Sequence, residues 1–231
     1  QDRAAELDTP IIDARVSTSW KTSSVESELI LETDASRYRL CLPLEGRFQR
    51  RNAGLAVIGA ELISSAGWEK IDRAAIELGI AECRWPGRME TVEISEERSV
   101  LLDSAHNQES IVLLRQHVEA LSKSGCRFNV LFGALRDKAA AGMLQTISEG
   151  AQSVVVVAPQ SDRAIAAEEL AGFASGAIAE VSCQRALDRA LAMDCDLTLV
   201  CGSIYLVGEV RTELRRRYGV PALAATVPIG R

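Results

Sequence analysis

The chain has 231 residues, of which 47% are hydrophobic and 25% are charged. This length suffices for one large domain or two small ones, and the composition argues against a disordered chain. The formal net charge of −6 provides no general basic surface, so nucleic acid is not expected as a partner. No run of about 18 apolar residues is present, so no membrane partner is expected either.

The six cysteines are scattered and include no C-x-x-C pair. In a chain of this size, this pattern indicates reduced, mostly buried thiols of a cytoplasmic protein rather than a disulfide framework or a zinc site. No basic segment followed by an apolar core opens the chain, so no secretory signal is expected. The first residue is Gln1 rather than Met, which suggests a processed product or a piece of a longer protein.

The first part of the chain is expected to be extended over residues 1–45 and helical after that. Short strands are expected at residues 11–12, 16, 29–31 and 38–42, and helices at 47–64 and 69–78. Within the first of these helices, Leu55, Ile58 and Leu62 share one face, which we expect to be buried. Residues 1–82 contain too few strands for a whole domain, so we place a domain boundary near residue 83.

From residue 83 onward, short apolar runs alternate with helical segments. The apolar runs, at 100–102, 130–132, 154–157 and 197–200, do not alternate in polarity, which predicts strands buried on both faces. The predicted helices cover about 108–122, 138–149, 163–173, 185–193 and 204–217. This alternation predicts an α/β domain over residues 83–231, with a Rossmann-like, mostly parallel sheet covered by helices.

Each predicted strand is followed by a residue suited to a ligand-facing loop: Asp103, Gly133, Pro159 and Gly202. Ligands of open α/β sheets bind beyond the carboxyl ends of the strands. Asp103 and His106 lie three residues apart at such an end, so one loop could direct both at a ligand. The alternative is that Asp103 only ends the strand and that Asn107 caps the helix that follows.

Neither G-x-x-x-x-G-K-[ST] nor G-x-G-x-x-G occurs in the chain, so nucleotide binding would have to use side chains or another domain. The segment W-P-G-R at 85–88 presents Arg88 on a turn that Pro86 and Gly87 make rigid, which suits phosphate binding. The alternative is a hinge between domains with a surface arginine.

The two histidines, His106 and His117, would be roughly 16 Å apart on one helix, so they cannot chelate one metal ion. In the segment G-A-L-R-D-K at 133–138, Asp137 suits a helix N-cap, and Lys138 could reach an anion or point to solvent. Ser203, after the last strand, could cap a helix or donate a hydrogen bond to a substrate carboxylate.

Five segments in order resemble the C-terminal half of folylpolyglutamate synthase, a Mur-type ligase family that is often bifunctional with dihydrofolate synthase. They are R-F-Q-R-R-N-A at 47–53, W-P-G-R at 85–88, L-D-S-A-H-N at 102–107, G-A-L-R-D-K at 133–138 and G-S-I-Y-L-V-G-E-V-R at 202–211. The last segment favours the folate branch over the murein ligases. Two positions depart from the family: Ser104 replaces Gly or Val, and Gln108 replaces Pro.

The resemblance implies an ATP-dependent amide ligase, in which an acyl phosphate is attacked by the amino group of glutamate. It implies that Asn52, Arg88 and Asp103 bind ATP, with Arg88 at the phosphates and Asp103 at the ribose. It further implies that His106 and Ser203 lie at the incoming glutamate. The partners of the full-length protein would be ATP, glutamate and folate or dihydropteroate.

The family's phosphate loop, magnesium ligands and folate pocket do not occur in this chain, and residues 1–82 resemble only the tail of its central ATPase domain. We therefore expect a C-terminal fragment that holds no metal ligands, that leaves ATP and magnesium mainly to the missing N-terminal part, and that is inactive alone. We expect a monomer, or a dimer induced by exposed strand edges in residues 1–82. Other readings are a murein amino-acid ligase or a stand-alone, non-catalytic module that binds a nucleotide or a protein.

Overall fold

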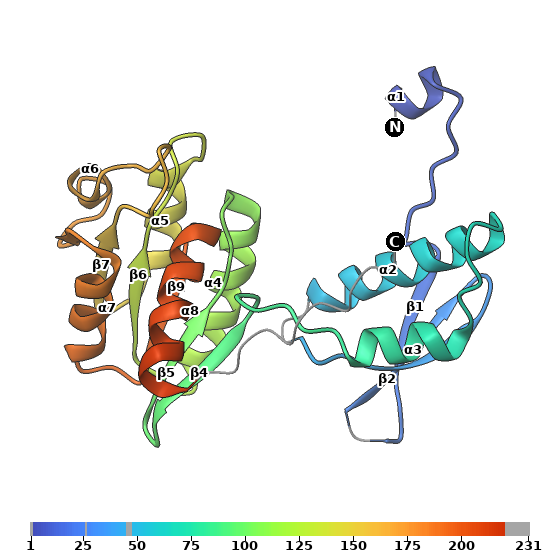
Figure 1. Ribbon diagram of the computed structural model, residues 1–231, viewed down its shortest axis with the longest axis horizontal. Coiled ribbons are helices and arrows are strands. Elements are labelled where there is room, and N and C mark those ends of the chain that lie inside the picture. Colours follow the sequence, from blue (N-terminus) through green and yellow to red (C-terminus); the bar gives the residue numbers. More distant parts are fainter. Residues whose placement is uncertain (1, 26, 45–47, 220–231) are drawn as a thin grey trace. The chain divides into compact units, whose positions relative to one another are not determined.

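A computed structural model describes residues 2–25, 27–44 and 48–219. The chain divides into two compact units, residues 1–84 and 85–231 (Figure 1). No helix within the described ranges is long and apolar enough to cross a membrane.

The first unit joins a small antiparallel sheet to two main helices. Its strands β1 (Thr18–Thr22), β2 (Glu28–Thr33) and β3 (Arg37–Cys41) pair in chain order, and its helices are α1 (Asp2–Glu6), α2 (Phe48–Ser65) and α3 (Arg73–Ala81). A core of Leu31, Tyr38, Leu40, Val57 and Ile76 joins the sheet to α2 and α3. The strands predicted at 11–12 and at residue 16 are wrong, and the prediction missed β1 and α1. Arg47, the predicted first residue of α2, lies outside the described residues.

The face that α2 buries agrees with the predicted one only at Ile58, which is buried. Ala53, Gly54 and Val57 are buried, whereas Leu55 is 50% exposed and Leu62 is 45% exposed. A Cβ at Gly54 would lie 3.5 Å from the Thr18 side chain, so the helix approaches β1 along its smallest residues. Small side chains allow this close packing, and it turns the larger leucines outward.

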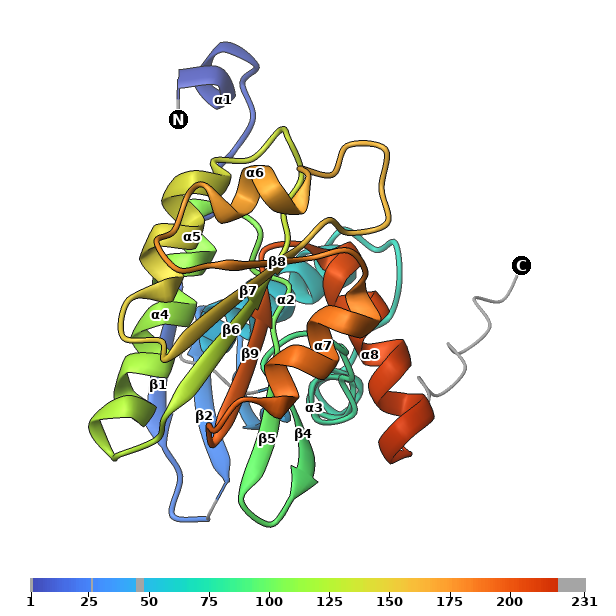
Figure 2. The same ribbon diagram turned by 90° about the vertical axis from the view of Figure 1, so that its left-hand side faces the viewer.

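The second unit is an α/β domain built on one six-stranded sheet with the order β4-β5-β9-β6-β7-β8 (Figure 2). Its strands are β4 (Glu90–Ser95), β5 (Arg98–Leu102), β6 (Phe128–Phe132), β7 (Ser153–Val157), β8 (Ile178–Glu180) and β9 (Leu197–Cys201). Only β4 pairs antiparallel with its neighbour, and all the other pairs are parallel. The predicted mostly parallel α/β sheet is therefore confirmed.

Helices cover both faces of this sheet, with α4 (Gln108–Lys123) and α5 (Ala140–Ser148) on one side and α7 (Cys183–Ala192) and α8 (Ile204–Tyr218) on the other (Figure 2). Val100, Leu102 and Val200 belong to the core cluster under α7 and α8. Strand β6 is buried along its whole length, as two covered faces require.

The helix predicted at 163–173 is largely wrong, since α6 covers only Ala167–Ala171. Residues before it instead form an isolated antiparallel bridge between Leu135 and Ala164. The Ile165 N–H donates to Ala134 O at 3.0 Å, and the Arg136 N–H donates to Arg163 O at 2.8 Å. These long-range backbone bonds hold the segment extended against the loop after β6.

The six cysteines are all free, but they are not mostly buried as expected. Only Cys195 and Cys201 are buried, whereas Cys41 is exposed and the remaining three are partly exposed. Alternation explains the difference at Cys41, which ends the edge strand β3 on the side away from the core.

Candidate active site

The loops after the parallel strands lie against one another at the carboxyl edge of the sheet. Gly202 has φ +99°, and a Cβ there would lie 2.5 Å from the Phe132 ring and 2.6 Å from Gly133 O. The Gly202 N–H donates to Ala105 O at 2.9 Å. The loops that follow β5, β6 and β9 are therefore in direct contact.

Asp103, directly after β5, is buried and connects two loops. Its Oδ1 accepts from the Ala105 N–H at 2.8 Å, and its Oδ2 accepts from the Met89 N–H at 3.0 Å. The side chain is 4% exposed. Burial raises the pKa of the Asp103 carboxyl above its ordinary value of 3.8, and the two N–H bonds partly offset this rise. Asp103 thus fixes the backbone of two loops by hydrogen bonds, and its predicted contact with ribose stays a prediction.

Arg88 lies on a loop whose residues before and after it are hydrogen-bonded to the end of β5. Before it, Gly87 O accepts from the N–H of Ser104 at 2.7 Å and from Ser104 Oγ at 2.8 Å. After it, the Met89 N–H is held by Asp103. Gly87 has φ +71° and Met89 has φ +51°, so the chain turns sharply on either side of Arg88. Arg88 makes no ion pair with any described residue and is partly exposed.

Ser104, one of the two departures from the family pattern, has a defined role here. Both its backbone N–H and its hydroxyl donate to Gly87 O, and its side chain is buried. A hydroxyl at this position adds a bond to the Arg88 loop that Gly or Val could not make.

His106 and Asn107 form the turn into α4. Asn107 is the N-cap: its Oδ1 accepts from the Ser110 N–H at 2.8 Å, and Ser110 completes a capping box. The capping alternative is therefore confirmed for Asn107. His106 Nδ1 lies 2.8 Å from Ser104 O, and because a carbonyl only accepts, Nδ1 carries the hydrogen. Its other nitrogen, Nε2, has no hydrogen-bond partner in the described parts of the chain.

Gln108, the second departure, replaces the missing proline with a contact between helices. Its Nε2 donates to Thr146 Oγ1 of α5 at 2.9 Å. The start of α4 is thus fixed by a cap and by this tie.

Ser203 is the N-cap of α8, and its Oγ accepts from the Tyr205 N–H at 3.2 Å. It is buried and adjoins Gly202, which contacts the loop after β5. The cap is confirmed. The hydroxyl proton is still available as a donor, so the contact with glutamate stays a prediction.

Asn52 lies in the other compact unit, on α2, with an exposed side chain whose Nδ2 donates to Gln49 Oε1 at 2.9 Å. Nothing in its surroundings tests nucleotide binding. Its assignment rests on the resemblance alone.

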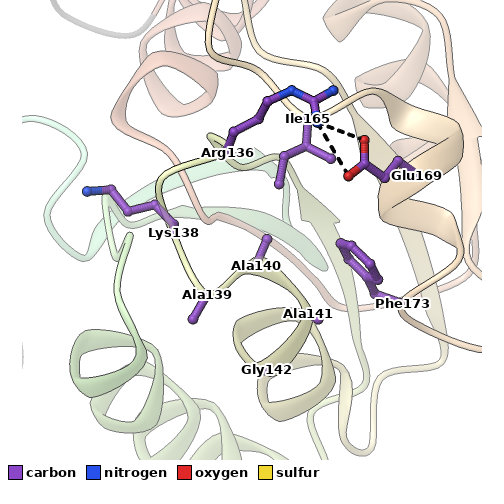
Figure 3. Close-up of a pocket in the computed structure, with 9 residues that line it drawn as sticks. All are labelled: Arg136, Lys138, Ala139, Ala140, Ala141, Gly142, Ile165, Glu169 and Phe173. Atoms are coloured by element: carbon purple, nitrogen blue, oxygen red, sulfur yellow. Dashed lines mark hydrogen bonds and ion pairs between the residues drawn. The ribbon is translucent and has the colours of Figure 1, made fainter.

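A cavity of about 350 Å³ lies beside the loop after β6, at the start of α5 (Figure 3). Arg136 reaches across it to Glu169, with 3.1 Å between a guanidinium nitrogen and a carboxylate oxygen, whereas Lys138 extends to the opposite side (Figure 3).

The predicted N-cap Asp137 is wrong: α5 begins at Ala140 without a side-chain cap. Asp137 instead pairs with Lys138 at 2.9 Å, which lowers the pKa of its carboxyl.

Two residues at this edge of the sheet, Glu90 and Arg211, were not predicted from the sequence to belong to the site. Glu90 accepts from the Gly87 N–H at 2.8 Å, and Arg211 donates to Glu90 from α8. Their positions in the sequence could have indicated them, because Glu90 lies two residues after Arg88 and Arg211 ends the last family segment.

No group of three or more His, Cys, Asp or Glu suited to a metal ion occurs among the residues that the structure describes.

Comparison with known proteins places the domain in a family. The family model for "Mur ligase, glutamate ligase domain" matches residues 87–204, just over half of the chain. A probable bifunctional folylpolyglutamate synthase/dihydropteroate synthase of Haloferax volcanii is 33% identical over 88% of this chain. A UDP-N-acetylmuramyl-tripeptide synthetase of Latilactobacillus sakei is 30% identical over 67% of it.

Among solved structures, E. coli FolC in complex with ADP, without folate substrate, matches 94% of this chain with a TM-score of 0.74 and 25% identity. The chain spans only part of each protein: 24% of the Haloferax relative, 30% of the Latilactobacillus relative and 51% of the FolC chain. The chain carries the glutamate ligase domain and belongs to the Mur ligase family.

Proposed function

We propose that this chain is the C-terminal part of an ATP-dependent ligase that adds glutamate to folate or dihydropteroate. The observation that carries the proposal is the contact between three family segments at one sheet edge. The Asp103–Asn107 turn is hydrogen-bonded both to the Arg88 loop and to the Gly202–Ser203 turn, within the segment that the family model matches.

The reaction would proceed in two steps. A carboxylate oxygen of the pterin substrate attacks the γ-phosphorus of ATP, and ADP leaves with the electrons of the broken P–O bond. The amino group of glutamate then attacks the acyl carbon, phosphate leaves, and the amine loses a proton. Both steps build negative charge on phosphoryl or acyl oxygens, which positioned cations and N–H donors stabilise.

In this proposal Arg88 binds the phosphates of ATP, Asp103 contacts the ribose, and Asn52 contacts the nucleotide. Arg88 suits its role because it is partly exposed on a rigid loop and makes no ion pair with the described residues. Arginine presents a fixed fork of donors that matches phosphate oxygens. Magnesium, which would neutralise phosphate charge, is assigned mainly to the part of the ligase outside this chain.

His106 and Ser203 would face the incoming glutamate. With Nδ1 tied to Ser104 O, His106 presents Nε2, which accepts a proton from the attacking amine or, when protonated, pairs with a carboxylate. Ser203 donates a hydrogen bond from its hydroxyl group to a carboxylate oxygen of glutamate. A cytoplasmic location, expected from the cysteines, belongs to the same proposal.

The test is glutamate-dependent release of ADP from ATP, measured for the isolated chain and for the full-length ligase that contains it. We expect turnover only in the full-length protein, and robust turnover by the isolated chain would contradict the fragment hypothesis.

In the full-length protein, Arg88→Ala should lower kcat/KM for ATP about 100-fold or more, as expected for the loss of a phosphate-directed charge. Lys138→Ala, which removes a cation already paired with Asp137, should have a far smaller effect. Near-wild-type rates for both variants would remove Arg88 from the site.

A murein amino-acid ligase is the second candidate, favoured by the match to the tripeptide synthetase. The same assay separates the two, with a UDP-muramyl peptide offered in place of folate or dihydropteroate. The folate branch is preferred because the Haloferax relative matches 88% of this chain, whereas the tripeptide synthetase matches 67% of it.

A further inference from the structure

The loop that carries Arg88 is held from a third side by a side chain that the proposed function does not use. Glu90 is the first residue of β4, and its Oε2 accepts from the Gly87 N–H at 2.8 Å. Together with Ser104 on Gly87 O and Asp103 on the Met89 N–H, this bond fixes the backbone on both sides of Arg88.

The Glu90 carboxylate is itself held by Arg211 of α8. Arg211 Nε donates to Glu90 Oε1 at 3.0 Å and to Oε2 at 2.9 Å. The two side chains are only 20% and 13% exposed. A charge-assisted contact of this kind is stronger than a neutral one, and limited exposure reduces its screening by solvent.

The pair therefore connects two parts of the proposed site through one helix. Helix α8 begins at its N-cap Ser203, assigned above to glutamate, and carries Arg211 two turns later. Across the pair lies the loop of Arg88, assigned to ATP. Among the described residues, the Glu90 carboxylate accepts hydrogen bonds from the Gly87 N–H and from Arg211 and reaches no other loop.

We propose that Glu90 and Arg211 are positioning residues that hold Arg88 in the geometry needed at the ATP phosphates. This inference rests on the proposed function, since it assumes that Arg88 binds phosphate. Preorganisation matters because a displacement of about 1 Å at a catalytic group can cost about 100-fold in rate. Removing Glu90 leaves the Gly87 N–H without its acceptor and releases the turn from one side.

The alternative is that the pair only stabilises the packing of β4 against α8. A double-mutant cycle separates the two roles in the full-length ligase. If Glu90 acts through Arg88, Glu90→Ala lowers kcat/KM for ATP about 10- to 100-fold, but the same change adds little once Arg88 is already Ala. Glu90→Gln keeps an oxygen that can accept from the Gly87 N–H, so it should lose less activity than Glu90→Ala.

A matched control is available on the same helix. Glu213 of α8 pairs with Arg217 at 2.6 Å, and these side chains are 18% and 20% exposed, close to the values for the Glu90 pair. Glu213→Ala and Glu213→Gln should leave kcat/KM for ATP unchanged. Thermal melting of all variants shows whether each remains folded, and Glu90→Gln serves if Glu90→Ala does not fold.

The isolated chain offers a second readout that needs no activity. Glu90→Ala should speed hydrogen exchange at the Gly87 and Met89 amides, and Glu90→Gln should do so to a smaller extent, whereas Glu213→Ala and Glu213→Gln should not. Additive losses in the cycle, or unchanged exchange at these amides, would overturn the positioning role while leaving Arg88 in the site. A wild-type kcat/KM in Arg88→Ala would instead overturn the assignment of Arg88 itself and the inference with it.

Discussion

Asp103 illustrates what a single residue contributes that spacing along the chain does not reveal. Its place after a buried strand predicts a functional loop, and its distance of three residues from His106 suggests a shared ligand. The structure adds a bond to the N–H of Met89, fourteen residues earlier in the chain. Such a pairing depends on how the loop before β4 returns to the end of β5, and no local pattern encodes it.

The Asp103 carboxyl should make stability depend on pH with a defined sign. Its pKa is raised in the folded state, so between pH 3.8 and that raised value the folded protein holds a proton that the unfolded chain has lost. Unfolding then releases a proton, and the contribution of Asp103 to the free energy of unfolding falls as pH rises.

Asp103→Asn tests this by urea unfolding between pH 4 and pH 7. The amide turns one donor toward a backbone N–H, which should destabilise the variant by about 1–3 kcal/mol. The difference between wild type and variant should narrow as pH rises from 4. A difference that widens instead would mean that the two N–H bonds outweigh burial in setting the pKa of Asp103.

At the scale of helices and strands, the predictions succeeded where the hydrophobic pattern in the sequence was strong, as in the strands that are buried on both faces. The strands β5, β6, β7 and β9 and the helices α4 and α8 follow their predicted ranges to within about two residues. The edge strands β4 and β8 were missed because one is half-exposed with charged residues and the other spans three residues. The predicted buried face of α2 was right at Ile58 but wrong at Leu55 and Leu62, because the helix packs through small residues that hydrophobicity alone does not single out.

The contact of the loops at the sheet edge depends on Gly202. A Cβ there would lie 2.5 Å from the Phe132 ring, and its φ of +99° is unfavourable for any other residue. Gly202→Ala should therefore destabilise the domain by about 2–4 kcal/mol through strain and overpacking.

The matched control is Gly208→Ala, within α8, where a Cβ would meet nothing within 4 Å. Alanine favours a helix over glycine by up to about 1 kcal/mol, so this variant should be neutral or more stable. Thermal and chemical unfolding of both variants measures the difference. Equal stability would show that the loops tolerate a shift at position 202.

At the scale of the whole chain, the solvent-facing side of α2 exposes large apolar side chains that a monomeric protein would ordinarily bury. Leu55 and Leu62 are about half exposed, and Trp68, after the helix, is 78% exposed. Nearby, β1 and β3 are the edges of their three-stranded sheet. Under the proposed function, these are surfaces that the rest of the ATPase domain would cover, and alone they favour self-association.

We expect the isolated chain to form dimers or larger species at micromolar concentration, measured by sedimentation velocity. The double variant Leu55→Glu/Leu62→Glu should shift the population toward monomer. Val112→Glu/Leu113→Glu, at 39% and 43% exposed positions of α4, is the control and should not. A wild-type chain that stays monomeric would show that this apolar surface does not drive association.

The central position of β9 has a consequence for how the domain is made. It is the last strand of the described chain, yet it lies between β5 and β6. Until it is synthesised, β4-β5 and β6-β7-β8 are two half-sheets that share no strand partner, and the facing edges of β5 and β6 expose unpaired backbone N–H and C=O groups. On the ribosome, this domain therefore cannot mature gradually from its amino end, and its assembly waits for residues 197–201 to emerge. A nascent chain halted before that point would present both half-sheets to chaperones.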